Sequence, residues 1–320
     1  MSSSLPTILV TGATGFLGLH LCQHLLAQGY RVKAVGRQVV YPITNENLSY
    51  HPIENIDGKT VWQDLLDDVA VIVHLAARVH QMKDRKMKAL SAYQDVNVRG
   101  TQQLVRQAVK GNVKRFIYVS SIKVNGEQTF EMPFRAEDQP QPQDAYSLSK
   151  LQGEQILQEE ARRQGMEWVI IRPPLIYGPK VKGNFAQLIA LAKTPYPLPF
   201  RLLKNQRSLV SIFNLVNFIE CCLHHPNAHR EVFLVSDNHD LSTSQLLLAL
   251  RKAFGRGGRL FPFPLFVLKL LGLLTGKRRQ VGRMTESLQV NIEKSTRLLN
   301  WLPPVTVEEA LKMTIVDSPK

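Results

Sequence analysis

Tyr146 and Lys150 are the residues of this chain whose types and spacing most clearly suggest chemistry. They stand four residues apart in AYSLSKLQGEQIL, which places both side chains on one face of a helix. A nearby ammonium group lowers the pKa of a phenol, because the positive charge favours the phenolate. A tyrosine tuned in this way can transfer a proton near neutral pH, as hydride transfer at a carbinol or carbonyl requires. On an exposed helix the same pair is only a solvated contact, so the interpretation depends on the upstream segments.

A glycine-rich segment near the N-terminus supplies the first support. TGATGFLG follows the apolar strand pattern LPTILVT and precedes the helical pattern FLGLHLCQHLLAQG, which is the context of a dinucleotide-binding loop. We expect Gly12 to make the tight turn, Gly15 to let the backbone approach a pyrophosphate, and Gly18 to let the helix pack on the strand. The helix N-terminus then faces the phosphates. The expected cofactor contacts from this segment are Gly12, Thr14, Gly15, Phe16, Leu17 and Gly18.

The end of the next strand pattern, RVKAVGRQ, bears on the choice of cofactor. NAD sites often have an acidic residue near this position for the ribose 2′-hydroxyl, whereas an arginine accommodates a 2′-phosphate. Arg37 therefore favours NADP, although an arginine after a strand is also common as a surface residue. The sequence predicts NAD(P) as the cofactor.

Strand and helix patterns alternate through the first half of the chain. Further strands are expected over 48–55, 69–77, 113–121 and 166–174, and helices over 61–68, 89–110 and around Tyr146. This alternation predicts an α/β fold, a doubly wound parallel sheet of the Rossmann type that binds ligands at the carboxyl ends of its strands. Pro, Gly and Lys then cluster from Pro173 to Gly183. We expect an NAD(P)-binding domain over 1–175, rejoined by a strand near 231–236, and a smaller substrate-binding lobe mainly over 176–320.

Charge and cysteine content indicate which partners and which cellular compartment to expect. The net charge of +14 is compatible with nucleic acid, an anionic membrane or an anionic substrate. No nucleic-acid partner is expected, because the aromatic interleaving of a single-strand binder is missing. Cys22, Cys221 and Cys222 have neither metal-ligand spacing nor a disulfide framework, so no metal and a reducing cytoplasm are expected. The N-terminus lacks the basic stretch of a signal peptide.

The order of several motifs points to a known family. TGATGFLG, HLAA, DVNVRGT, VSSIKVNG, YSLSK and RPPLIYGP follow one another, and together they resemble the extended short-chain dehydrogenase/reductase family of nucleotide-sugar epimerases, dehydratases and reductases. The resemblance covers nearly the whole chain, including LLNWLPPVTVEEAL. It implies a Rossmann domain, a C-terminal lobe that holds a nucleoside-diphosphate sugar, and a homodimer.

The resemblance also implies catalytic roles for four residues. Ser121 matches the residue that hydrogen-bonds the reacting oxygen, and Tyr146 matches the acid/base. Lys150 matches the lysine that lowers the tyrosine's pKa and holds the nicotinamide ribose. Asn97 matches an asparagine that supports the site from behind. Alternatively, Ser121 simply ends a strand and Asn97 is a buried amide satisfied by backbone.

Cofactor and substrate contacts follow in the same way. Ala76, Ala77 and Pro173 are expected along the cofactor. The expected substrate contacts are Lys123, Asn125, Asn184, Arg207 and Arg283. Arg207 matches the arginine that clamps the diphosphate, an anion that suits a planar guanidinium, and Arg283 is a second candidate.

Two departures from the family pattern affect the predicted reaction. Asn125 and Gly126 stand where many relatives have tyrosine and glycine, which changes a pocket wall. Ile122 and Lys123 stand where the 4,6-dehydratases have aspartate and glutamate. Without a carboxylic acid to protonate the leaving hydroxyl, dehydration is not expected.

Three functions stay open. The sequences of these motifs are most similar to those of bacterial enzymes of surface-polysaccharide (O-antigen) synthesis that are UDP-glucose 4-epimerase-like. This group includes the reductases that form UDP-N-acetylquinovosamine. We favour reduction of a UDP-4-keto-6-deoxy-N-acetylhexosamine by NAD(P)H. The alternative is NAD-dependent 4-epimerisation of UDP-glucose or UDP-N-acetylglucosamine. A non-catalytic dinucleotide sensor is a remote third, because it would not need Ser121, Tyr146 and Lys150 together.

The segment RLFPFPLFVLKLLGLLTGKRR, residues 259–279, is unusually apolar. Pro264 and Lys269 interrupt it, and it is too short to span a bilayer. We expect a helix that packs in the core or in a dimer interface. The alternative is peripheral membrane contact through 260–279, with the basic flank Lys277, Arg278 and Arg279.

Overall fold

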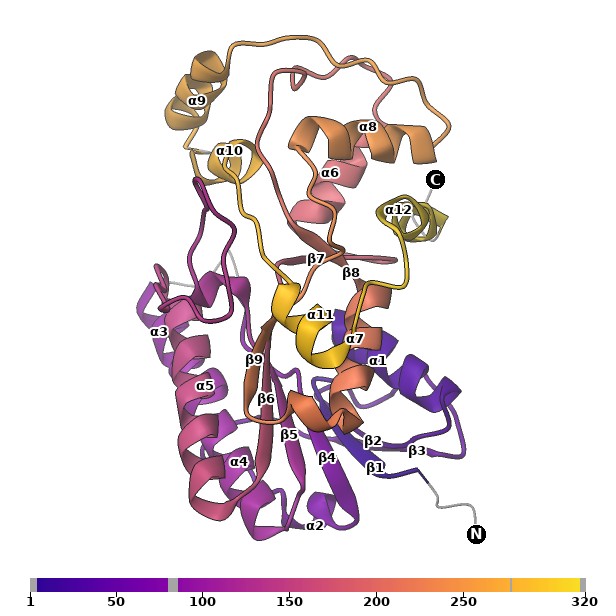
Figure 1. Ribbon diagram of the computed structural model, residues 1–320, viewed down its shortest axis with the longest axis vertical. Coiled ribbons are helices and arrows are strands. Elements are labelled where there is room, and N and C mark those ends of the chain that lie inside the picture. The colour runs from indigo at the N-terminus through magenta and orange to yellow at the C-terminus, as the bar shows by residue number, and fades with distance from the viewer. Residues whose placement is uncertain (1–4, 80–85, 277, 317–320) are drawn as a thin grey trace.

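A parallel sheet of seven strands forms the centre of the computed structural model, which describes residues 5–79, 86–276 and 278–316. The strand order is β3-β2-β1-β4-β5-β6-β9 (Figure 1). The strands are β1 (Thr7–Thr11), β2 (Arg31–Gly36), β3 (Leu48–Pro52), β4 (Val69–His74), β5 (Arg115–Val119), β6 (Glu167–Arg172) and β9 (Glu231–Leu234). The order reverses between β1 and β4, and ligands of such sheets bind at the carboxyl ends of the strands beside that reversal.

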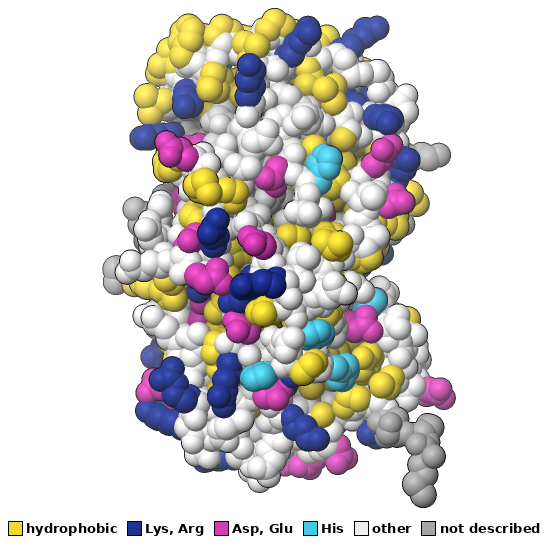
Figure 2. Space-filling view, viewed as in Figure 1, with side chains coloured by type: hydrophobic (Ala, Val, Ile, Leu, Met, Phe, Trp, Pro, Cys, Tyr) yellow, Lys and Arg dark blue, Asp and Glu magenta, His cyan; other side chains and the backbone are white. Residues whose placement is uncertain are grey.

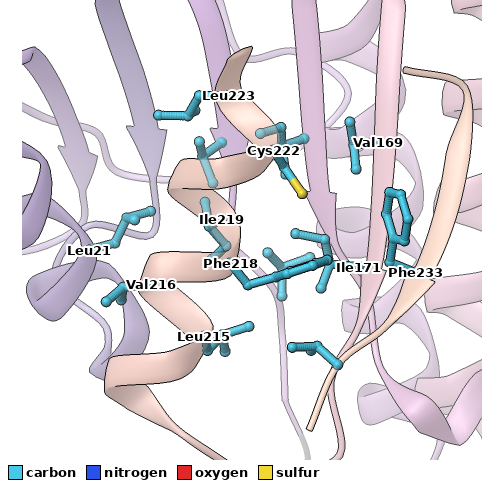
Figure 3. Close-up of a cluster of buried hydrophobic side chains, with 14 of the residues drawn as sticks. Leu21, Val169, Ile171, Leu215, Val216, Phe218, Ile219, Cys222, Leu223 and Phe233 are labelled. Carbon is cyan, nitrogen blue, oxygen red and sulfur yellow. The ribbon is translucent and has the colours of Figure 1, made fainter. Parts of the chain in front are cut away.

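Helices cover both faces of the sheet, which confirms the predicted doubly wound α/β fold. Strands β1 and β5 are buried at every position, as expected for parallel strands covered on two sides. On one face lie α1 (Phe16–Ala27), α7 (Ile212–His224) and α11 (Glu293–Leu299), and on the other lie α2 (Gln63–Leu66), α4 (Thr101–Lys110) and α5 (Ala145–Gln164). Figure 3 shows the first of these cores, where Phe218 and Cys222 of α7 lie against Val169, Ile171 and Phe233.

The long helix predicted over 89–110 is not a regular α-helix throughout. It consists of α3 (Lys86–Tyr93), a π-helical segment η1 (Gln94–Gly100) and α4. Gly100 allows close packing at this point, because a Cβ atom there would lie 2.8 Å from the Cγ2 atom of Ile56. Segments of π-helix are rare and are frequently found at functional sites.

A second, smaller lobe has its own apolar core, which is built from three separate stretches of chain around 177–209, 241–254 and 305–311. Its elements are β7 (Leu175–Tyr177), α6 (Asn184–Lys193), β8 (Leu209–Ser211), α8 (Thr243–Ala253), α9 (Leu265–Leu274), α10 (Arg278–Thr285) and α12 (Val307–Val316). Two short 3-10 turns, η2 (Ile122–Val124) and η3 (Pro226–Ala228), complete the described chain. The stretches between these lobe segments return to the sheet as α7, β9 and α11.

The apolar segment 259–279 packs only in part in the core of the lobe. Helix α9 packs on α10, but Phe266 and Leu274 are each 73% exposed and Leu270 is 50% exposed. Leu260 and Leu268 contact the core of the lobe, as predicted, whereas the exposed face of α9 does not pack in the core. Packing in a dimer interface stays a prediction. Lys277 of the predicted basic flank lies outside the described residues. Among the helices of the described chain, none combines the length and the hydropathy needed to cross a bilayer.

Candidate active site

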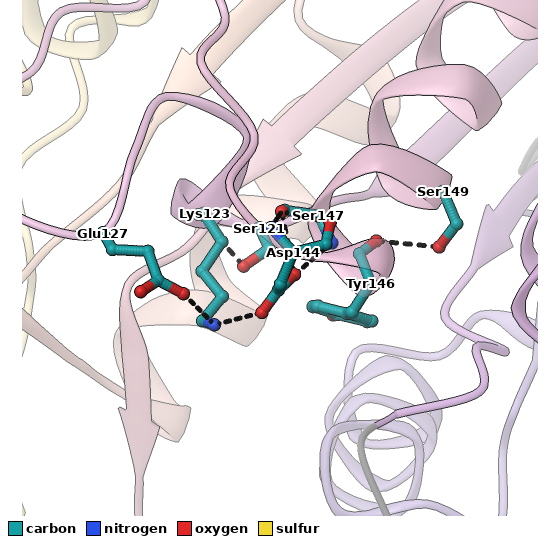
Figure 4. A network of polar contacts seen from close by, with 7 residues as sticks. All are labelled: Ser121, Lys123, Glu127, Asp144, Tyr146, Ser147 and Ser149. Atoms are coloured by element: carbon teal, nitrogen blue, oxygen red, sulfur yellow. Dashed lines mark hydrogen bonds and ion pairs between the residues drawn. The ribbon is translucent and has the colours of Figure 1, made fainter. Parts of the chain in front are cut away.

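The start of α5 fixes the register of the predicted catalytic pair. Asp144 caps the helix, since its carboxylate accepts a hydrogen bond from the Ser147 backbone N–H at 2.7 Å, and Ser147 Oγ accepts one from the Asp144 N–H at 3.1 Å. Such a capping box sets where a helix begins. Tyr146 therefore lies in the first turn, where Figure 4 shows it beside Ser121 and Asp144. Lys150 lies one turn later on the same face of the helix.

Ser121 and Tyr146 meet at the carboxyl end of β5. Ser121 follows the strand in an extended conformation, and its Oγ accepts a hydrogen bond from the Lys123 backbone N–H at 3.3 Å. The Ser121 hydroxyl also lies near enough to the Tyr146 phenol to lower the pKa of that phenol. The structure therefore brings together the hydroxyl and the phenol that the sequence predicted as partners.

The pKa of Tyr146 differs from the sequence expectation. Burial, the negative charge of Asp144 and the neighbouring Tyr93 together raise it to about 12, against the effect of Ser121. Lys150 does not lower it, because burial lowers the pKa of Lys150 itself to about 7. The ammonium Nζ lies 4.0 Å from the centroid of the Tyr118 ring. The sequence predicted that Lys150 lowers the pKa of Tyr146, and in the protein by itself the pKa of Tyr146 is raised instead.

An aromatic floor supports Lys150. The Tyr118 ring of β5 stacks on the His74 ring of β4, with centroids 5.7 Å apart. Gly153 makes room for it, because a Cβ atom there would lie 2.4 Å from the Tyr118 hydroxyl. His74 is fully buried, and burial followed by the charge of Lys150 lowers its pKa to about 3. The floor is thus neutral, and its rings attract the lysine.

Asn97 ties two elements together behind the site. Its Oδ1 accepts a hydrogen bond from the Arg78 backbone N–H at 2.7 Å, and its Nδ2 donates to the Arg78 carbonyl at 3.1 Å. The same Nδ2 donates to Ser149 Oγ at 2.9 Å. Asn97 belongs to the π-helical segment, and it holds the chain after β4 against α5. The two bonds to the Arg78 backbone are those of the alternative, a buried amide satisfied by backbone. The supporting role of Asn97 in catalysis stays a prediction.

The glycine loop fits a dinucleotide. Gly12 has φ +70°, and a Cβ atom on Gly18 would lie 2.2 Å from the Gly12 carbonyl oxygen. Gly15 caps α1 without a side-chain hydrogen bond. Within the described residues the first turn of this helix thus has no capping side chain, which leaves its N–H groups available to an anion. Lys150 is 1% exposed, and within the described chain its ammonium makes no hydrogen bond. A buried cation without a hydrogen-bond partner suits a polar ligand.

The other residues predicted for the cofactor lie at the same edge of the sheet. Ala76 and Ala77 follow β4, and the Ala76 N–H donates to Thr11 Oγ1 at 3.3 Å. Pro173 follows β6, and its carbonyl accepts a hydrogen bond from the Ile122 N–H at 3.0 Å. Arg37 follows β2 and is exposed.

Two predicted substrate contacts are engaged inside the protein. Lys123 Nζ lies 2.8 Å from Glu127 and 2.6 Å from Asp144. Asn125 is 2% exposed, and it donates from Nδ2 to the Arg135 carbonyl at 2.9 Å. Its Oδ1 accepts from Arg172 at 3.0 Å. These contacts hold both side chains within the fold, and their role as substrate contacts stays a prediction.

The predicted diphosphate arginines lie together in the lobe. Arg207 Nη1 donates to the carbonyl oxygens of Arg283 and Glu286, both at 3.1 Å. Burial and the adjacent Arg283 charge lower the pKa of Arg207, against the effect of Glu286. Asn184 is exposed at the start of α6.

Sequence reasoning missed a buried ion pair next to the site. Arg172 Nη2 and Nε lie 2.6 and 3.0 Å from the two carboxylate oxygens of Glu154, and the two side chains are 5% and 3% exposed. Glu154 stands four residues after Lys150 and raises its pKa, which burial lowers. The spacing Tyr146, Lys150, Glu154 along one helix face was the available signal. Tyr93 was also missed; its ring lies 6.1 Å from that of Tyr146.

Comparison with known proteins identifies the class. The chain belongs to the NAD dependent epimerase/dehydratase family, whose sequence profile matches residues 8–236. This confirms the family predicted from the motifs.

Particular relatives are similar over nearly their whole length. The chain is 44% identical over 311 residues to a UDP-glucose 4-epimerase of Vibrio cholerae, covering 96% of this chain and 94% of the relative. It is 27% identical over 326 residues to an N-acetyl-alpha-D-glucosaminyl-diphospho-ditrans,octacis-undecaprenol 4-epimerase of Escherichia coli O157:H7, with coverage of 96% and 94%. The crystal structure of UDP-glucuronic acid 4-epimerase from Bacillus cereus in complex with NAD has the same fold, with a TM-score of 0.76, 24% identity and coverage of 97% and 98%.

Proposed function

We propose that this protein is an NAD(P)-dependent enzyme that transfers hydride at C4 of a UDP-sugar, and that its net reaction is 4-epimerisation. The observation that carries the proposal is the Ser121–Tyr146 pair beside Lys150 at the edge of the sheet that also holds the glycine loop. The 44% identity to a protein named UDP-glucose 4-epimerase supports this reaction over the reduction that the sequence alone favoured.

The chain's own residues have defined tasks in this proposal. Tyr146 takes the proton from the O4 hydroxyl and later returns it, while Ser121 hydrogen-bonds the same oxygen. Lys150 holds the ribose through its uncommitted ammonium, and the glycine loop holds the pyrophosphate through backbone N–H groups. NAD⁺, when bound there, would supply the hydride acceptor and a positive charge. Because burial raises the pKa of Tyr146 to about 12, we expect that added charge to be needed before the phenol gives up its proton near neutral pH.

The lobe supplies the substrate's binding energy in this proposal. Arg207 and Arg283 are adjacent cations that suit the two phosphates of a nucleoside diphosphate. Asn184 remains a candidate contact to the nucleotide. Lys123 and Asn125 shape the pocket through their ion pairs and hydrogen bonds.

A second candidate is reduction of a UDP-4-keto-6-deoxy-N-acetylhexosamine by NAD(P)H. The observation that favours it is the exposed Arg37 directly after β2, where an NAD site commonly has an acidic residue. In this reaction Tyr146 donates its proton to the oxygen at C4. The same catalytic residues serve both candidates.

The identity of the coenzyme and its turnover separate the candidates. An epimerase should interconvert UDP-glucose and UDP-galactose, or their N-acetyl forms, with no net change in NADH absorbance. A reductase should oxidise added NADPH only when a UDP-4-keto sugar is present. Tyr146→Phe is the control and should abolish either signal. If the wild-type protein gives neither signal on these substrates while binding a dinucleotide, the enzyme proposal fails and the sensor alternative gains support.

A further inference from the structure

The outer end of the C-terminal lobe has an unusual charge distribution. Residues 241–285 contain nine Lys or Arg residues and no Asp or Glu. In the described part of this stretch, α8, α9, α10 and the segment that joins α8 to α9 form the end of the molecule farthest from the sheet (Figure 1). Figure 2 shows hydrophobic and basic side chains gathered at this end. The nearest acidic residues in the chain, Asp240 and Glu286, flank the stretch.

Large apolar side chains stand exposed in the same place. Phe266, Leu270, Leu273 and Leu274 recur at the spacing of one helix face, and they are 73%, 50%, 58% and 73% exposed. The other side of α9 packs on α10, since a Cβ atom on Gly272 would lie 2.6 Å from Val281 Cγ2. The α9 surface, as we name it, comprises Phe261, Leu265, Phe266, Leu270, Leu273 and Leu274 with the exposed cations Arg256, Arg259, Lys269 and Arg278.

The mixture of side chains specifies the kind of partner. Lys269 lies between Phe266 and Leu273 along the helix, so its aliphatic stem runs beside apolar side chains while its ammonium can reach a polar layer. A ten-residue helix is about 15 Å long, which suits a helix lying in an interface plane. Apolar side chains on one face with cations around them are the signature of helices that bind anionic lipid surfaces.

We propose that the α9 surface docks on a bilayer that contains anionic phospholipids and so holds the lobe at the membrane. The proposal is independent of which reaction the protein catalyses. A second copy of this chain fits less well, because apposing two such surfaces would bring together cations without an acidic partner anywhere in 241–285.

Vesicle sedimentation tests the proposal with the full chain. The probes are vesicles of phosphatidylcholine alone and vesicles with about 30% phosphatidylglycerol. We expect the wild type to bind only the anionic vesicles and to be released by salt. Phe266→Ser combined with Leu274→Ser should lower the partition coefficient at least about tenfold. The matched control is Val61→Ser, which removes a 72% exposed apolar side chain near α2, at the opposite end of the molecule, and should bind like the wild type.

Three results would overturn the proposal. The first is that the wild-type protein does not bind anionic vesicles at low salt. Equal binding by the wild type and the double variant would attribute binding to basic charge elsewhere. Concentration-dependent self-association that the double variant abolishes, without vesicle binding, would assign the surface to a second copy. Unchanged melting temperature and activity on a soluble substrate check that the double variant is folded.

Discussion

Replacing Glu154 by glutamine would leave Arg172 as a buried cation without a counter-charge. The substitution nearly preserves the shape of the side chain but removes the carboxylate that lies 2.6 and 3.0 Å from the guanidinium. Arg172 cannot release its proton in a protein, and its side chain is only 5% exposed. Breaking a buried pair from one side costs about 3–5 kcal/mol.

The expected change in melting temperature follows from chain length. With about 2.1 cal/mol/K of unfolding entropy per residue, 320 residues give about 0.67 kcal/mol/K. A cost of about 3–5 kcal/mol then lowers the melting temperature by about 4–8 °C, measured by scanning calorimetry. Glu159→Gln on the same helix is the matched control, because Glu159 and its partner Arg163 are 65% and 60% exposed. Exposed pairs contribute about 0–1 kcal/mol, so this control should shift the melting temperature by less than about 2 °C.

A double substitution separates the charge from the packing. Glu154→Met with Arg172→Met removes both charges, and it should recover most of the lost stability. Recovery should be incomplete by about 1–3 kcal/mol, because Asn125 Oδ1 loses its donor. A shift for Glu154→Gln no larger than that for Glu159→Gln would refute the reasoning, and so would a double variant less stable than the single one.

Three further predictions concern the site. Tyr146→Phe should lower kcat by about 10²–10⁴-fold while leaving dinucleotide affinity unchanged by calorimetry, because only the proton-transfer group is lost; a decrease in affinity with unchanged kcat would contradict this. Asp144→Asn keeps a capping side chain but removes a charge that raises the pKa of Tyr146, so the rise of log(kcat/KM) with pH should move to lower pH, and a move to higher pH would be inconsistent with the structure. Burial holds the pKa of His74 at about 3, well below its value of about 6.5 in the unfolded chain; its contribution to stability is therefore fully present above about pH 6.5 and is lost as the pH falls toward 3. Urea unfolding should show a dependence of about 1.4 kcal/mol per pH unit in that window, which His74→Gln should flatten.

The parts of the site that local spacing determines were predictable from the sequence. Tyr146 and Lys150 share a helix face whatever surrounds them. The glycines of the loop indicate a tight strand-to-helix turn. Ser121 follows a strand whose apolar pattern is plain. Parallel strands bring their carboxyl ends to one edge, so these segments had to meet there.

The parts that depend on contacts between distant segments were not predictable. Lys123 pairs with Asp144, which stands 21 residues away, and only the folded chain makes that contact. Lys150 lies over the ring of Tyr118, a residue of β5, and burial lowers the pKa of Lys150. The periodicity of the sequence reports neither the contact nor the burial. The exposure of α9 likewise depends on how few elements pack around it, because an apolar segment alone does not say what covers it.

The repeated crossing of the chain between sheet and lobe has a consequence for engineering. Strand β9 and helices α7 and α11 follow lobe segments in the sequence, yet they complete the sheet and one of its cores. A fragment that ends at residue 175 would expose the edge of β6 and an uncovered apolar face, which favours aggregation. Under the proposed function the lobe holds the substrate, so a single crossover in the gene would not move substrate preference between relatives. A chimera must exchange all three lobe stretches together, with junctions where the chain leaves and re-enters the sheet.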